Sequence, residues 1–243
     1  MKSSIPNILT ASNLFCGCIA VMYVFLGQAD MCAYFIFAAL IMDFLDGFVA
    51  RMLKVSSPVG KELDSLADMV GFGLVPGLIL TRMLAESQGL TFPEMEISSS
   101  NLWIFSGLLV TIFSALRLAK FNLDERQSDA FYGLPTPANT ILILALWLIS
   151  SYWNTNWMAP PLNNSWILVG ITIFSSYILV ADVRLIALKF KDFGLQGNLA
   201  RFILIGLSVI LLASLQIPGI PLIILLYLLL SLLDNQGLFG AKE

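Results

Sequence analysis

Histidine is missing from this 243-residue sequence, and its absence removes several classes of chemistry. The chain can form no Ser-His-Asp or Cys-His nucleophile, no His-ligated zinc site and no His-ligated haem site. The three cysteines, Cys16, Cys18 and Cys32, lie in or beside apolar runs, so we interpret them as small apolar residues and expect no disulfide or metal site from them. Polar chemistry must therefore come from carboxylates, Lys, Arg and hydroxyl groups.

Charged residues are also scarce. Only 12% of the residues are charged and 58% are hydrophobic, whereas a soluble domain carries about 25% charged residues. The mean hydropathy is +0.87. Because a soluble core of this size cannot hide so much apolar surface, the composition predicts an integral membrane protein. The net charge of −3 and the scattered basic residues give no footprint for a nucleic-acid partner.

Apolar runs of about the 20 residues that a bilayer crossing needs recur along the chain. We predict an all-α fold with about eight transmembrane helices, at residues 8–26, 31–53, 64–85, 102–123, 136–153, 165–181, 199–214 and 217–233. The first run has no small-residue cleavage site after it, so we interpret it as a retained helix. The last two are short and are expected to form a helical hairpin. In the third, Gly71, Gly73, Pro76 and Gly77 indicate a kink or an opening.

Lys and Arg are unevenly distributed between the two sides of this layout. With the N-terminus inside, twelve of the 13 basic residues fall in or beside the segments on one side, and only Arg82 falls on the other. Because basic loops stay in the cytoplasm, both termini are predicted to be cytoplasmic in a multi-pass protein of the cytoplasmic (inner) membrane. Residues 182–198 alternate apolar and basic positions at helical spacing, which predicts an amphipathic helix on the same surface.

Four aspartates interrupt the second and third predicted spans, where ionisable residues are rare. Asp43 and Asp46 are three residues apart, and Asp64 and Asp68 are four apart. Both spacings place two carboxylates on one helix face, and the short linking loop predicts that the two faces meet. Four converging carboxylates repel one another, and oxygen ligands without His or Cys favour a hard cation such as Mg²⁺ or Mn²⁺. All four are therefore predicted metal ligands.

Small residues continue the same helix faces. Gly47 and Ala50 lie four and seven residues after Asp43, and Gly60 lies four before Asp64. Missing side chains beside a metal site leave room for a flat, bulky group to approach the backbone. Three cations are expected around this pocket: Arg51, Lys54 and Lys61. Divalent metal together with Arg is typical of sites that bind a diphosphate and transfer a phosphoryl group, and we predict that chemistry.

These residues occur at fixed intervals, as Asp43-x2-Asp46-Gly47-x2-Ala50-Arg51-x8-Gly60-x3-Asp64-x3-Asp68. This pattern resembles the complete signature of the CDP-alcohol phosphatidyltransferase family. Three further stretches, residues 5–14, 117–122 and 131–138, resemble the phosphatidylserine synthase branch of that family. Two positions depart from the branch pattern: Lys120 stands where Arg is common, and Gly71 stands where Ser is common.

The resemblance implies an enzyme that transfers the phosphatidyl group of CDP-diacylglycerol to L-serine, giving phosphatidylserine and CMP at the cytoplasmic face. It implies one catalytic domain over 1–243, with a six-helix core over about 1–181 followed by a hairpin over about 199–233. It also implies a homodimer with two metal ions in each subunit.

Residue roles follow from the same resemblance. Asp68 is the expected general base for the serine hydroxyl. The expected CDP-binding residues are Asn7, Asp46, Gly47, Ala50, Arg51 and Gly60. The expected acceptor-binding residues are Arg117, Lys120 and Asn122. They stand at the end of the fourth predicted span, and the positive charge there could bind a carboxylate. A basic anchor that reaches toward the membrane surface is the alternative interpretation of that cluster.

Two alternative functions remain open at this point. Within the family, the acceptor could be another alcohol, such as glycerol 3-phosphate or an inositol phosphate, or the lipid donor could be of the archaeal type. From a different class, the four aspartates could be the transport site of a divalent-cation transporter. A transporter would place ionisable groups near the middle of the membrane, whereas these lie near the cytoplasmic ends of their helices.

Overall fold

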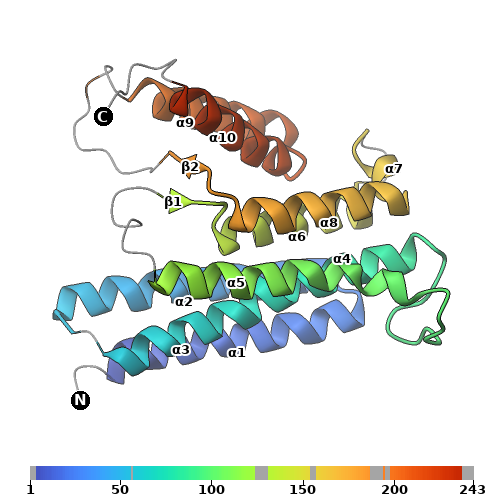
Figure 1. The fold of residues 1–243 in the computed structure, drawn as a ribbon, viewed down its shortest axis with the longest axis horizontal. Helices are drawn as coiled ribbons and strands as arrows, with labels where there is room; N and C mark the ends of the chain where they lie inside the picture. Colours follow the sequence, from blue (N-terminus) through green and yellow to red (C-terminus); the bar gives the residue numbers. More distant parts are fainter. Residues whose placement is uncertain are drawn as a thin grey trace.

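The computed structural model describes residues 4–55, 57–123, 131–153, 157–186, 194 and 198–236, and most of them are helical. Each of the eight predicted apolar segments forms a helical stretch, and the longer helices run roughly along one common direction (Figure 1). Their bounds are α1 Ser4–Leu26, α2 Ala29–Leu53, α3 Pro58–Asp68, η1 Met69–Leu74, α4 Val75–Glu86, η2 Leu102–Leu108, α5 Leu109–Leu123, α6 Thr136–Tyr152, α8 Ser165–Val180, α9 Leu199–Leu215 and α10 Gly219–Asn235; a short helix, α7 Ala159–Leu162, precedes α8.

Among the residues that the structure describes, four helical stretches are long and apolar enough to cross a membrane: Ser4–Leu26, Ala29–Leu53, Pro58–Glu86 and Leu102–Leu123. The helices α6, α8, α9 and α10 are apolar but only 16 or 17 residues long, so eight full crossings stay a prediction. Large apolar side chains point outward along several helices; Phe15, Phe37 and Tyr177 are 66%, 65% and 65% exposed. So many exposed apolar side chains are typical of a lipid-facing surface, and the fold is that of an all-α membrane protein.

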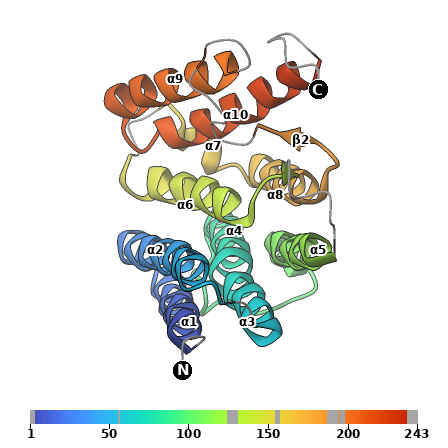
Figure 2. The same ribbon diagram turned by 90° about the vertical axis from the view of Figure 1, so that its left-hand side faces the viewer.

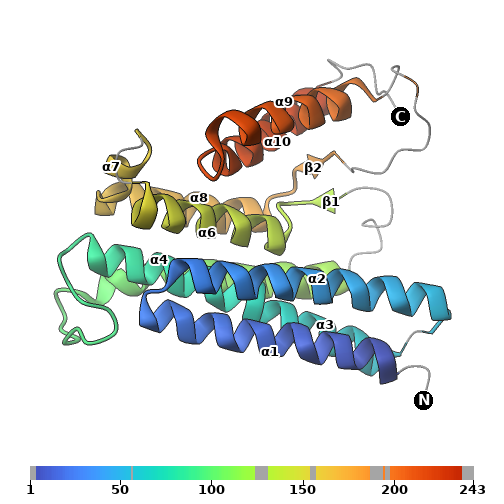
Figure 3. The same ribbon diagram turned by 180° about the vertical axis from the view of Figure 1, so that it is seen from behind.

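The helices form layers that Figure 2 shows end-on. Helix α1 packs along α2 and also against α3 and η1. It therefore lies in contact with both halves of the α2–α3 pair. The approach of α1 to η1 is close because Gly17 faces Gly71; a Cβ atom on Gly17 would lie 3.1 Å from the Gly71 Cα. The α9–α10 hairpin stacks on α6 at the other side of the molecule (Figure 3).

One part of the chain departs from the all-helical expectation. Strands β1 (Phe131–Tyr132) and β2 (Arg184–Leu185) form a two-residue antiparallel pair. The predicted amphipathic helix at 182–198 is therefore wrong at β2, and residues 187–193 and 195–197 lie outside the described residues. Backbone pairing with a distant segment overrides the local helical periodicity here, because Gly133 N–H also donates to the Val183 carbonyl at 3.1 Å.

The third predicted span is continuous but changes its winding after Asp68. Residues Met69–Leu74 form the π-helical segment η1, in which the Val75 N–H donates to the Val70 carbonyl five residues earlier. Side chains from two other helices bond to carbonyls of this wide turn: Thr111 Oγ1 donates to Gly73 O and Thr140 Oγ1 to Phe72 O, both at 3.0 Å. The irregularity that Gly71 and Gly73 indicated is thus a π-helical segment held between α5 and α6.

The start of α1, the end of α2, the start of α3 and the end of α5 lie at the same end of the molecule (Figure 1). Two hydrogen bonds join the last two: Lys61 Nζ donates to the Asn122 carbonyl at 3.0 Å, and Asn122 Nδ2 donates to Ser65 Oγ at 2.8 Å. At the opposite end, Arg82 Nη1 donates to the Val24 carbonyl at 2.9 Å. Its Nε lies 2.7 Å from Glu86 Oε1, out of line for a hydrogen bond.

Candidate active site

Three of the four predicted metal ligands come together between α2 and α3. Asp43, Asp64 and Asp68 each offer a carboxylate oxygen, and these oxygens lie within 4.8 Å of one another. The helical spacing accounts for this, since Asp64 and Asp68 are one turn apart on α3 and Asp43 faces them from α2. Carboxylates at such distances repel strongly unless a cation or a proton neutralises part of their charge.

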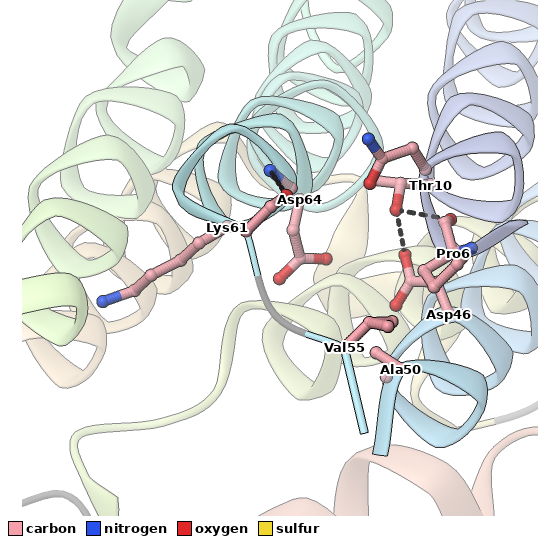
Figure 4. A pocket seen from close by; sticks show the side chains of 11 residues that line it. Pro6, Thr10, Asp46, Ala50, Val55, Lys61 and Asp64 are labelled. Carbon is pink, nitrogen blue, oxygen red and sulfur yellow. Dashed lines mark hydrogen bonds between the residues drawn. The ribbon is translucent and has the colours of Figure 1, made fainter. Parts of the chain in front are cut away.

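The fourth predicted ligand, Asp46, is oriented differently. It is buried, with 6% of its surface exposed, and its Oδ2 accepts a 2.6 Å hydrogen bond from Thr10 Oγ1 of α1. Asp46 lies outside the group of three, and it projects into an adjoining cleft opposite Asp64 (Figure 4). The two aspartates of α2 therefore have different neighbours although they share one helix face.

A hard divalent cation fits this donor set. The ligand atoms are carboxylate oxygens, the type that Mg²⁺ and Mn²⁺ prefer. One oxygen of Asp64, Oδ1, is buried and has no hydrogen-bond partner. None of the three clustered carboxylates forms an ion pair with a Lys or Arg among the described residues. The residues at this site could thus hold divalent metal ions.

The cleft next to the aspartates has a volume of about 280 Å³, near the small end of the roughly 300–1,000 Å³ range of ligand pockets. Residues from α1, α2 and α3 and from the α2–α3 link form its walls: Pro6, Asn7, Thr10, Asp46, Gly47, Ala50, Val55, Ser57, Gly60, Lys61 and Asp64. Five of the six predicted CDP-binding residues are among them. The sixth, Arg51, is exposed and does not line the cleft, but its guanidinium lies beside Gly47.

Gly60 lies where α3 comes close to α1. Its N–H donates to the Ser57 hydroxyl at 3.0 Å, which caps the start of α3. A Cβ atom at this position would lie 2.9 Å from Ser57 Oγ and 3.1 Å from Asn7 Oδ1. Lys61 lines the cleft, as expected, but its ammonium group is directed away from the cleft (Figure 4) and donates to the Asn122 carbonyl.

The three predicted acceptor residues on α5 differ in burial and in their contacts. Arg117 is buried, with 8% of its surface exposed, and it interacts electrostatically with Asp68. Lys120 is exposed and has no hydrogen bond or ion pair within the part of the chain that the structure describes. Asn122 uses its amide and its carbonyl to join α5 to α3. The structure thus brings only Arg117 close to the aspartates.

Two residues of α1 belong to this site although sequence reasoning did not single them out. Thr10 bonds to Asp46, and Asn13 Nδ2 donates to Asp68 Oδ1 at 3.3 Å. Both follow Asn7 at intervals of three residues and so share its helix face. A stripe of polar side chains on an otherwise apolar span was the available signal, because buried polar groups in a membrane helix require partners.

The fold and the site together define the class of protein: an integral membrane protein that could bind divalent metal through clustered carboxylates beside a cleft of small residues. The particular family follows from comparison with known proteins. The chain belongs to the CDP-alcohol phosphatidyltransferase family, whose model matches residues 3–178. This range includes every residue of the site and leaves out α9 and α10.

Curated relatives share one name, CDP-diacylglycerol--serine O-phosphatidyltransferase. The protein of Helicobacter pylori (strain J99) is 33% identical over 202 residues, which cover 82% of this chain and 77% of the relative. That of Bacillus subtilis (strain 168) is 37% identical over 134 residues, 55% of this chain and 69% of the relative. That of Methanocaldococcus jannaschii is 31% identical over 173 residues, 71% of each chain.

Proposed function

We propose that this protein transfers the phosphatidyl group of CDP-diacylglycerol to the hydroxyl of L-serine, producing phosphatidylserine and CMP. The observation that carries the proposal is the joining of a carboxylate cluster to a nucleotide-sized cleft through Asp64, which belongs to both. The relatives' shared name supports serine as the acceptor. The same name gives no support to the cation-transporter alternative.

The aspartates have the oxygen donors for divalent metal, Mg²⁺ or Mn²⁺, and two ions in each subunit match the presence of four carboxylates. Asp43, Asp64 and Asp68 would hold one part of the site, and Asp46 the part beside the cleft. Bound metal would neutralise charge on the diphosphate and on the leaving phosphate. The cytidine lies in the cleft between Asn7, Gly47, Ala50 and Gly60, and Arg51 approaches its phosphates from the rim.

The reaction is a displacement at the phosphorus that bears the diacylglycerol. The serine hydroxyl oxygen forms a bond to this phosphorus, and the bond from the phosphorus to the oxygen bridging to CMP breaks. CMP leaves with that electron pair, and Asp68 accepts the serine hydroxyl proton. Asp68 suits this task because it belongs to the carboxylate cluster and also interacts electrostatically with the buried Arg117. Arg117 binds the serine carboxylate as a charge-assisted pair.

The orientation in the membrane follows from the same proposal. The site faces the cytoplasm of the cytoplasmic membrane, both termini are cytoplasmic, and all eight apolar helices cross the bilayer. The catalytic core extends over about 1–181, the α9–α10 hairpin over about 199–233 covers α6, and the protein works as a homodimer. The excess of Lys and Arg in the sequence segments on the same side of the predicted layout as the aspartates supports this orientation.

The test is an assay of the purified protein in lipid nanodiscs with CDP-diacylglycerol, Mn²⁺ or Mg²⁺ and one acceptor at a time: L-serine, glycerol 3-phosphate or an inositol phosphate. We expect CMP release and a phosphatidylserine product with L-serine only, as identified by mass spectrometry. A different lipid product would move the protein to another acceptor within the family. Absence of CMP release with every acceptor and either metal would overturn the proposed activity.

A further inference from the structure

Three buried polar side chains on the helices that pack against η1 each have an atom without a hydrogen-bond partner. They come from three different helices: Asn13 from α1, Arg117 from α5 and Thr136 from α6, with exposed fractions of 0%, 8% and 0%. The unpartnered atoms are Asn13 Oδ1, Arg117 Nε and Thr136 Oγ1. Buried polar atoms are nearly always hydrogen-bonded, so three unpaired atoms on helices that all pack against η1, the segment directly after Asp68, point to a ligand.

Asn13 is directed at Asp68 by a hydrogen bond. Its amide Nδ2 donates to Asp68 Oδ1 at 3.3 Å, which leaves its carbonyl oxygen as a free acceptor. This oxygen lies over η1, where a Cβ atom on Gly71 would be only 3.8 Å away. The absence of a side chain at Gly71 therefore keeps space open beside the free acceptor.

Thr136 begins α6, the helix that packs against η1. Thr140, one turn further along α6, bonds to the carbonyl of Phe72, which is itself one turn after Asp68. Because α6 and α3–η1 run in the same direction (Figure 1), Thr136, one turn before Thr140, lies toward the Asp68 end of this contact. Arg117 completes the group, since it interacts electrostatically with Asp68 from α5.

We propose that Asn13 and Thr136 recognise the ammonium group of the acceptor, so that the site selects a hydroxy-amino acid and not merely a hydroxy acid. The inference rests on the proposed function. An ammonium group has three N–H donors and no acceptor, and it matches the free oxygens Asn13 Oδ1 and Thr136 Oγ1. Arg117 takes the carboxylate, and the hydroxyl is left at Asp68. The four side chains thus match the three functional groups of serine.

The wild-type protein gives the first test, using two compounds that each lack one group of serine. 3-Hydroxypropionate keeps the hydroxyl and the carboxylate but lacks the ammonium group, and ethanolamine lacks the carboxylate. We expect kcat/KM for L-serine to exceed that for 3-hydroxypropionate by at least about tenfold, the scale of one charge-assisted hydrogen bond. Equal kcat/KM values for L-serine and 3-hydroxypropionate in the wild-type protein would by themselves overturn the proposal.

Variants then assign the recognition to residues. In Asn13→Ala and in Thr136→Val, the ratio of kcat/KM for serine to that for 3-hydroxypropionate should fall by about fivefold or more. The ratio is the informative quantity, because loss of the Asn13 hydrogen bond to Asp68 slows both acceptors alike and cancels. Retention of the wild-type ratio in both variants would mean that Asn13 only positions Asp68, and it would overturn the ammonium assignment.

Thr140→Val is the matched control for Thr136→Val. Thr140 has the same side chain on the same buried face of α6, but its hydroxyl already bonds to the Phe72 and Thr136 carbonyls. Its loss should leave the acceptor ratio unchanged; an equal fall of the ratio in this control would show a packing effect and count against the proposal. Failure of the proposed function is distinct, because the wild-type protein would then make no phosphatidylserine.

Discussion

The replacement Gly60→Ala tests whether the cleft between α1 and α3 binds the CDP group. The new methyl carbon would lie 2.9 Å from Ser57 Oγ and 3.1 Å from Asn7 Oδ1, so both side chains must move by a few tenths of an ångström. Both line the cleft, and their movement narrows it. Overpacking of this kind costs about 1–3 kcal/mol.

The fold itself should tolerate the change. Alanine is better than glycine in a helix by about 1 kcal/mol, and weakening the Ser57 cap costs about the same, so the two effects nearly cancel. Without ligand, the Ser57 and Asn7 side chains can relax into the cleft, so the steric cost falls on the bound state. We expect the KM for CDP-diacylglycerol to rise about tenfold, which corresponds to roughly 1.4 kcal/mol, with little change in the melting temperature.

The assay is CMP release at varied CDP-diacylglycerol and saturating serine, with thermal unfolding followed in parallel. Gly170→Ala is the matched control, because Gly170 lies within α8 and a Cβ atom there would have no neighbour within 4 Å. The control should keep the wild-type KM. An unchanged KM in Gly60→Ala would refute the reasoning, because the glycine would then serve only the packing of α3 and the nucleotide would bind elsewhere.

Four further replacements address three separate parts of the molecule. Asp43→Asn and Asp64→Asn should each lower kcat/KM at least about 100-fold and weaken Mn²⁺ binding in calorimetric titration; an unaltered titration would remove that residue from the metal site. Arg117→Ala should raise the KM for serine at least about tenfold and that for the CDP lipid less, whereas equal rises would assign Arg117 to the diphosphate or the fold. Arg82→Met should lower the free energy of unfolding by about 2–3 kcal/mol but leave kcat/KM at low temperature unchanged, because Arg82 bonds to Val24 at the end opposite the aspartates.

Much of the fold was predictable because each apolar run is long and bounded by polar or breaking residues. The meeting of Asp43 with Asp64 and Asp68 was also predictable, since it needs only helical spacing and a short link. The orientation of Asp46 was not, because its partner Thr10 is 36 residues away and lies on another helix. Local spacing reports which residues share a face and gives no information on which distant side chain meets them.

The same limit applies to other parts of the site. Lys61 was expected beside the pocket and does line it, but its ammonium group donates to the carbonyl of Asn122, 61 residues away, and so is directed out of the cleft. Asn13 was overlooked because a single polar residue in an apolar run has no pattern of its own. It becomes informative only together with Asn7 and Thr10, which precede it at three-residue intervals.

The π-helical segment η1 separates the angular phase of α3 from that of α4. Each residue of a regular α-helix turns the chain by about 100°, so a wide turn that accommodates one additional residue rotates everything before it by that amount relative to everything after it. The face of α4 that buries Ile79 and Leu80 can therefore pack in the core while Asp64 and Asp68 point toward α2. Deletion of one residue within Met69–Leu74 would give regular α-helical winding and could keep the packing of α4. It would, however, rotate both carboxylates out of the cluster. The number of residues in this segment, and not its side chains alone, therefore determines which way the Asp64 and Asp68 carboxylates point.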